Sequence, residues 1–109
     1  MSDQRASKRR EERKFRRIFV RYGHRAAEHH AVAQQITTKG FFLSTNEIVY
    51  AKGSPILVEI ASPGETWVVA GVVRHAFKVH PNMARFTKPG MGVELTQIPP
   101  ACSAYLASL

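Results

Sequence analysis

The stretch QITTKGFFLST, from Gln35 to Thr45, joins a polar segment to an apolar one through a single glycine. Residues 32–38 (VAQQITT) predict one strand, and the period-2 geometry of a strand places Gln35 and Thr37 on the same face. Gly40 breaks this pattern and permits a positive φ. Residues 41–43 (FFL) then predict a second, buried strand. The stretch therefore predicts two strands joined by a short glycine turn that carries polar side chains.

Four other segments rich in β-branched and aromatic residues predict strands, namely residues 18–22, 56–60, 67–77 and 91–95. Turn signals at residues 53–55 and 62–65 separate them, and the polar residues 24–30 and 80–89 predict loops. Gly71, in the middle of the longest segment, predicts a bulge or a close backbone approach. Pro99 and Pro100 open a helix over residues 101–109. The pattern predicts a mainly β domain: a six-stranded antiparallel barrel with one C-terminal helix.

Most of the net charge of +8 lies at the N-terminus, because residues 1–21 contain nine Lys or Arg and only three acidic residues. Residues 1–14 show no apolar periodicity, so we expect a basic arm there and one barrel domain over residues 15–109. Such an arm favours polyanions, including phosphates, nucleic acid and anionic lipid headgroups. A solvated run of charge is the commoner explanation of such a segment.

The sequence contains no pattern typical of catalysis or metal binding. The five histidines follow no ligand spacing, and Cys102 is the only cysteine, so we expect neither a metal site nor a disulfide. Ser44 and Ser54 lack the setting of a catalytic nucleophile. No apolar run approaches the ~20 residues of a membrane span, and no signal-peptide core follows the basic N-terminus. We therefore expect a cytoplasmic protein that is not an enzyme and needs no cofactor or metal.

Two short motifs, taken with the order of the predicted strands, resemble the PilZ domain. RKFRR places Arg13 and Arg17 in an RxxxR spacing before the first predicted strand, and QITTKG is an imperfect form of the pattern [D/N]xSxxG. The segments FFLST, KGSPILVEIA, WVVAGVVRH and PGMGVELTQI then follow in the order of that family, whose members serve as bacterial receptor modules for cyclic di-GMP. The resemblance covers most of the chain and implies a PilZ-like barrel.

The resemblance also implies a cyclic di-GMP site, formed by Arg13, Arg17, Gln35, Thr37, Lys39 and Gly40. Arginine suits this ligand because its planar donors fit phosphate oxygens and guanine O6 and N7, and because it stacks on bases. The second motif departs from the family pattern at three positions: Gln35 replaces Asp or Asn, Thr37 replaces Ser, and Lys39 stands where a second glycine is common. The RxxxR spacing also recurs from Arg5 to Arg21, so Arg13 and Arg17 are selected by their place before the first strand.

The resemblance implies a cyclic di-GMP receptor or adaptor of bacterial second-messenger signalling that passes its signal to a partner protein. Binding would order the residues around Arg13 and Arg17 against the barrel. An alternative is a divergent adaptor that binds no ligand and acts through protein–protein contacts. A nucleic-acid-binding barrel is a third and weaker hypothesis, since its stacking rings must be exposed. The aromatic residues of the strands have apolar neighbours and are expected in the core: Phe41, Phe42, Trp67 and Phe77.

Overall fold

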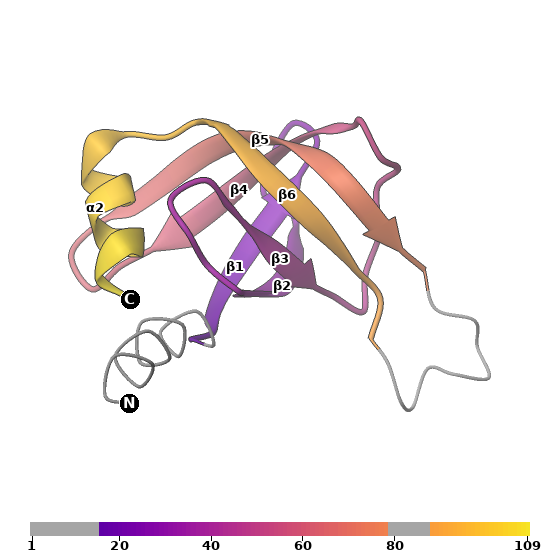
Figure 1. Cartoon of the computed structure of the whole chain (residues 1–109), viewed down its shortest axis with the longest axis horizontal. Coiled ribbons are helices and arrows are strands. Elements are labelled where there is room, and N and C mark those ends of the chain that lie inside the picture. Colours follow the sequence, from indigo (N-terminus) through magenta and orange to yellow (C-terminus); the bar gives the residue numbers. More distant parts are fainter. Residues whose placement is uncertain (1–15, 79–87) are drawn as a thin grey trace, which may run out of the picture.

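The computed structural model describes residues 16–78 and 88–109, which form six strands and one helix (Figure 1). The elements are β1 (Ile18–Gly23), β2 (His29–Gln34), β3 (Gly40–Ser44), β4 (Pro55–Ala61), β5 (Thr66–Phe77), β6 (Gly90–Gln97) and α2 (Pro100–Ser108). The strands form a closed barrel in the order β1-β2-β3-β6-β5-β4, and each pairing is antiparallel. The predicted fold class is thus confirmed. The predicted arm over residues 1–14, Arg13 within it, and most of the loop over residues 80–89 lie outside the described residues.

The core is the interior of the barrel, which alternate side chains of the strands fill. On β4, for example, Ile56, Val58 and Ile60 point inward and are at most 1% exposed, whereas the residues between them are partly accessible. Tyr22 and Leu43 are also fully buried. Burying an aliphatic side chain of this size contributes roughly 1.5–3 kcal/mol. Since the inward positions hold the fold together, the outward positions remain free for other roles.

Helix α2 closes one end of the barrel (left in Figure 1). Pro99 is extended and precedes the first turn, as the sequence predicted. Cys102 and Leu106 are buried, and the Tyr105 ring lies 5.6 Å from that of Trp67 on β5. The helix is therefore an integral part of the core. No helix among the described residues is long and apolar enough to cross a membrane.

The segment between β2 and β3 differs from its prediction. The strand expected over residues 32–38 ends at Gln34, because Gln35 has a φ of 54°, in the left-handed region. This one residue changes the direction of the chain, so that Ile36 is buried like Ala33 rather than sharing the outer face of Val32. Gln35 and Thr37 are therefore not on one strand face. The polar loop predicted for residues 24–30 is also too long, because β2 already begins at His29.

The side chains of β5 change from one alternation of inward and outward positions to another partway along the strand. Its pairing with β6 shifts next to Gly71, where an added Cβ would lie 2.7 Å from the carbonyl oxygen of Glu94, as expected for a bulge with close backbone approach. A second shift, between Val73 and His75, reverses the alternation, so that Val73 is buried whereas His75 and Phe77 lie outside. The two shifts therefore interrupt the regular alternation of inward and outward side chains along β5.

The expected burial of the aromatic residues is likewise only partly correct. Phe41 is in the core and Trp67 is half-buried. Phe42 alternates with Phe41 and is half-buried on the outer face of β3, and Phe77 is 53% exposed. The sequence could not distinguish these faces, since β3 has two adjacent phenylalanines and β5 contains a bulge.

Candidate functional site

The turn between β2 and β3 contains the QITTKG motif and is organised by Thr37. The Thr37 hydroxyl donates to the carbonyl of Gly40 at 3.1 Å and accepts from the backbone N–H groups of Lys39 and Gly40, each also at 3.1 Å. The backbone N–H of Thr37 donates to the same Gly40 carbonyl at 2.9 Å. A hydroxyl offers one donor and two acceptor positions, and all three are used. Thr37 therefore holds the shape of the turn.

The same turn is attached to β6. The carbonyl of Lys39 accepts a hydrogen bond from the backbone N–H of Leu95 at 2.8 Å. Gly40 pairs with Glu94, and a Cβ added to Gly40 would lie 2.1 Å from the carbonyl oxygen of Val93. Glycine is thus required here for the close approach of two strands. The expected positive φ belongs instead to Gln35.

Next to this turn lies a hollow of about 300 Å³ on the outer face of β2 and β3, which we call the basic hollow. It is lined by Arg17, Val32, Gln34, Ser44 and Lys88. Its two charged residues are both cations, and its amide and hydroxyl can donate or accept hydrogen bonds. The hollow can therefore receive an anionic, hydrogen-bonding ligand.

A second hollow of about 210 Å³ adjoins the first, since both include Val32, Ser44 and Lys88. Phe19 on β1, His30 and Glu47 are among its other lining residues. Phe19, Val32 and Ser44 are cross-strand neighbours on β1, β2 and β3. The two hollows thus form one concave surface across three strands.

The structure gathers only part of the predicted site residues. Arg17 lines the basic hollow, whereas Arg21 forms an ion pair with Glu59 on β4 at 3.4 Å. Gln35 and Lys39 are exposed in the turn that follows Gln34, outside the lining of the hollow. Sequence reasoning missed three polar lining residues, Gln34, Ser44 and Lys88, and the apolar Val32. A prediction that ended the second strand at Gln34 would have indicated this residue as a candidate. Ser44 and Lys88 reach the hollow only through the pairing of the strands, which the sequence does not show.

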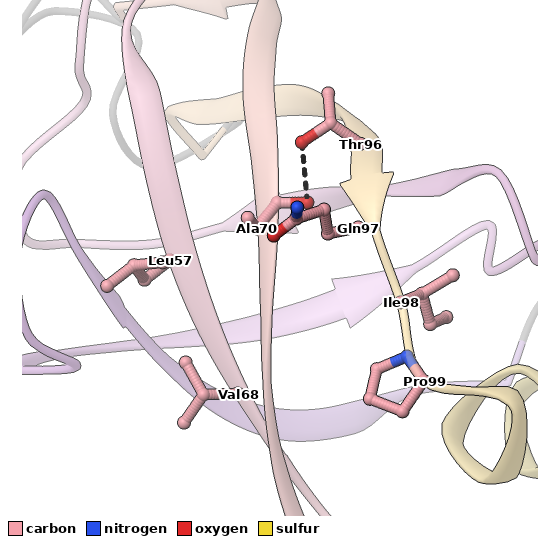
Figure 2. Close-up of a pocket in the computed structure, with 7 residues that line it drawn as sticks. All are labelled: Leu57, Val68, Ala70, Thr96, Gln97, Ile98 and Pro99. Atoms are coloured by element: carbon pink, nitrogen blue, oxygen red, sulfur yellow. Dashed lines mark hydrogen bonds between the residues drawn. The ribbon is translucent and has the colours of Figure 1, made fainter.

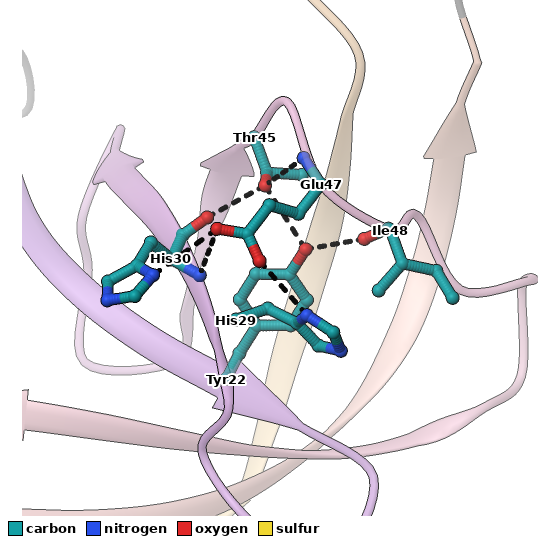
Figure 3. A network of polar contacts seen from close by, with 6 residues as sticks. All are labelled: Tyr22, His29, His30, Thr45, Glu47 and Ile48. Atoms are coloured by element: carbon teal, nitrogen blue, oxygen red, sulfur yellow. Dashed lines mark hydrogen bonds and ion pairs between the residues drawn. The ribbon is translucent and has the colours of Figure 1, made fainter.

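A polar network fixes the wall of the second hollow (Figure 3). The buried Tyr22 hydroxyl donates to the carbonyl of Ile48 and lies 3.1 Å from the hydroxyl of Thr45. Thr45 in turn donates to the carbonyl of His30 at 2.8 Å and accepts from the backbone N–H of Glu47 at 2.9 Å. Burial is the main cause of a raised pKa for Tyr22, so its hydroxyl is protonated and can donate. These contacts tie the segment after β3 to β1 and β2.

Glu47 joins two adjacent histidines in the same network. Its carboxylate accepts from the backbone N–H of His30 at 3.1 Å and lies 3.0 Å from Nδ1 of His29 and 3.3 Å from Nδ1 of His30. The hydrogen bond from the His30 backbone is the main cause of a lowered pKa for Glu47, followed by that from His29. The acid of the second hollow is therefore ionised at neutral pH and already bound by its neighbours.

A larger hollow of about 600 Å³ lies elsewhere, between β4, β5 and the end of β6 (Figure 2). Figure 2 shows Leu57 and Val68 on one side and Ile98 and Pro99 on the other. The lining contains no charged residue. It is thus suited to an apolar contact rather than to an anionic ligand, despite its greater volume.

The described residues offer no evident catalytic group. Burial raises the pKa of the Cys102 thiol, so this cysteine is protonated at neutral pH and is a poor nucleophile. Within residues 16–78 and 88–109, no three His, Cys, Asp or Glu side chains gather in a way that could hold a metal ion. The basic hollow offers charges and hydrogen-bonding groups for binding.

Substitution Gly40→Ala is expected to destabilise the protein by about 1–3 kcal/mol, because the added methyl group meets the backbone of β6. Urea denaturation would measure this loss. Gly64→Ala is the matched control, since an added Cβ there meets no atom within 4 Å, and it should change the stability by less than about 0.5 kcal/mol. Equal effects of the two substitutions would contradict the assigned role of Gly40.

Substitution Glu47→Gln is expected to lower the melting temperature in a pH-dependent manner. The pKa of Glu47 is lower in the folded protein than its ordinary value of 4.5, so its ionised form stabilises the fold above pH 4.5, and this contribution is lost as the pH falls through the folded pKa. The deficit of the variant should therefore be complete at neutral pH and shrink in acid. Thermal melting from pH 7 to pH 3 would measure it, with Glu65→Gln as control. A deficit that stays constant across this range would refute the explanation.

The comparisons with known proteins concern the fold. The chain matches no protein-family model, and a search of curated protein sequences finds no match. Among solved structures it is similar to that of the inhibitor of motility MotI/DgrA from Bacillus subtilis, with a TM-score of 0.67 and 19% sequence identity. The similarity covers 86% of this chain and 45% of that protein, so this chain corresponds to less than half of the neighbour's length. At this identity the likeness establishes that the two chains share a barrel fold.

Proposed function

We propose that this protein is a cytoplasmic adaptor of bacterial second-messenger signalling that binds cyclic di-GMP and passes the signal to a partner protein without catalysis. The observation that supports this most is the basic hollow, with Arg17 and Lys88, beside the turn that carries the PilZ-like motif. The similarity to MotI/DgrA adds support, because that protein is named as an inhibitor of motility, which is a regulatory role.

The chemistry of the hollow suits a cyclic dinucleotide, which has two phosphates and two guanines. Arg17 would bind a phosphate through two parallel hydrogen bonds or the O6/N7 edge of a guanine. Lys88 would serve as a point charge for the phosphate groups. The Gln34 amide oxygen would accept from guanine N–H groups and Ser44 would donate to a phosphate. The hollow is at the lower end of the ~300–1,000 Å³ of small-molecule sites, so we propose that the ligand is only partly enclosed.

The residues of the motif would then divide into two groups. Thr37 and Gly40 are used by the turn itself, so they would contribute by holding its shape. Gln35 and Lys39 have exposed side chains and would contact the ligand, one through its amide and the other through its charge. Arg13, also part of the proposed site, lies outside the described residues.

The apolar hollow in Figure 2 favours the alternative of an adaptor that acts through protein contacts alone. Val68 in its wall is 56% exposed, and burying such a side chain against a partner is favourable. This surface is compatible with either function. The two functions differ in whether the basic hollow binds a nucleotide.

Isothermal titration calorimetry with cyclic di-GMP tests the proposal, with GMP as the ligand control. We expect saturable binding that Arg17→Ala weakens about tenfold or more, because a hydrogen bond to a charged group is lost. Lys52→Ala is the matched control, since Lys52 is an exposed cation that lies outside the hollow, and it should bind like the unaltered protein. Absence of heat with the unaltered protein would favour the ligand-free adaptor instead.

Substitution Gln35→Asp restores the acid of the family motif and is expected to increase the affinity for cyclic di-GMP about fivefold. A carboxylate accepts a stronger hydrogen bond than an amide, and Asp tolerates the left-handed backbone of this position. Gln35→Asn has the same shorter length without the charge and separates the two effects. If neither substitution changes the affinity, Gln35 does not contact the ligand.

A further inference from the structure

Three ring side chains form a cluster on the outer face of the barrel beside the basic hollow, which we call the aromatic cluster: the half-buried Phe42 of β3, and the exposed His75 and Phe77 of β5. The ring centroids of Phe42 and Phe77 are 5.9 Å apart. Those of His75 and Phe77 are 6.3 Å apart, and the two rings are inclined by only 29°. Phe77 is 53% exposed. A contiguous group of exposed apolar rings is uncommon on the surface of a soluble protein and can indicate a binding site.

The backbone of β6 supports these rings, because two of its outward positions between β3 and β5, Gly90 and Gly92, are glycines. A Cβ added to Gly90 would lie 2.4 Å from the ring of Phe42, and one added to Gly92 would lie 3.3 Å from the ring of His75. The rings therefore lie close against β6. Only one side of these rings contacts β6. The exposed part of Phe77 therefore remains available to contact a ligand.

The aromatic cluster borders the basic hollow. Phe42 is the cross-strand partner of Gln34, and Phe77 is that of Gly90, which in turn pairs with Ser44. On the opposite side of the hollow, Phe19 is 87% exposed and is the cross-strand partner of Val32. Since neighbouring strands are about 4.8 Å apart, the backbones at β1 and β3 are separated by about 10 Å. Exposed rings thus stand on both sides of the hollow.

The charges on this face are complementary to a chain of phosphates. Arg17 and Lys88 line the basic hollow, and the exposed Lys78 directly follows Phe77. The nearby acids are engaged by neighbours: Glu94 is paired with Arg74, and Glu47 with the two histidines of β2. Among the described residues, the cations that remain without an acidic partner in these ion pairs make the face positive.

We propose that this face binds single-stranded nucleic acid, with bases stacked on Phe19 and on the aromatic cluster and phosphates held by Arg17 and Lys88. Rings on a strand surface beside a positive groove are the combination by which single strands are bound with little sequence preference. A duplex would bind less well, because its bases are already stacked on one another. This function goes beyond the proposed nucleotide sensing, although both would use the basic hollow.

Fluorescence anisotropy tests this with a labelled, mixed-sequence DNA strand of about 12 nucleotides, within the site sizes of such barrels, and with the duplex of the same sequence. We expect the full chain to bind the single strand more tightly than the duplex. Phe77→Ala and Phe19→Ala should each weaken binding of the single strand at least fivefold. Val68→Ala is the matched control, since this exposed apolar residue lines the uncharged hollow, and it should have no effect.

Thermal melting of each variant would show that the fold is retained, which the exposure of both phenylalanines favours. Equal affinity for single strand and duplex would overturn the proposal, because attraction of phosphates to the basic residues gives that result without any stacking. Unchanged binding in both phenylalanine variants, or absence of binding, would overturn it as well. The calorimetric titration with cyclic di-GMP is independent of these outcomes, so the two proposals can fail separately.

Discussion

The pairing of β3 with β6 is the contact on which the rest of the structure depends. It joins the meander β1-β2-β3 to the later strands, and together with the pairing of β1 and β4 it closes the barrel. A closed barrel has no free sheet edge. The pairing requires a glycine at position 40, where the backbone of β6 leaves no room for a Cβ. The residue that completes the PilZ-like motif is thus also a residue that allows closure.

The same pairing creates the outer surface. It places Ser44 beside Gly90 and Phe42 beside Gly92, and the pairing of β6 with β5 then adds Phe77 and His75. Because inward side chains supply the core, substitutions at the exposed His75 and Phe77 can alter binding at little cost in stability. The polar network of Tyr22 contributes rigidity, since it fixes the segment after β3 that forms one wall of the second hollow.

The sequence predicted the fold better than it predicted the site. Strands, turns and the terminal helix follow from local patterns, namely apolar alternation, glycine and proline. No local pattern indicated that the chain turns at Gln35. A glutamine at positive φ is uncommon, and the residues around it match the pattern of one continuous strand. The bulge after Val73 also has no local signature, and it determines which face Phe77 occupies.

The basic hollow could not be predicted from the spacing of residues in the sequence. Gln34 and Ser44 come together through the pairing of β2 with β3, and the pairing of β3 with β6 brings in Lys88 from a distant part of the sequence. The motif was more informative about local structure, since its hydroxyl and glycine build and anchor the turn through contacts that the structure describes. A ligand role for Gln35 and Lys39 stays a prediction.

The two proposed ligands would depend on the same cations, and this has a thermodynamic consequence. If cyclic di-GMP occupies Arg17 and Lys88, a single strand loses its proposed phosphate contacts, so binding of one ligand must weaken binding of the other. Such coupling is reciprocal by necessity. A shared basic hollow flanked by rings would therefore make the nucleotide a regulator of nucleic-acid binding, without any change in the conformation of the barrel.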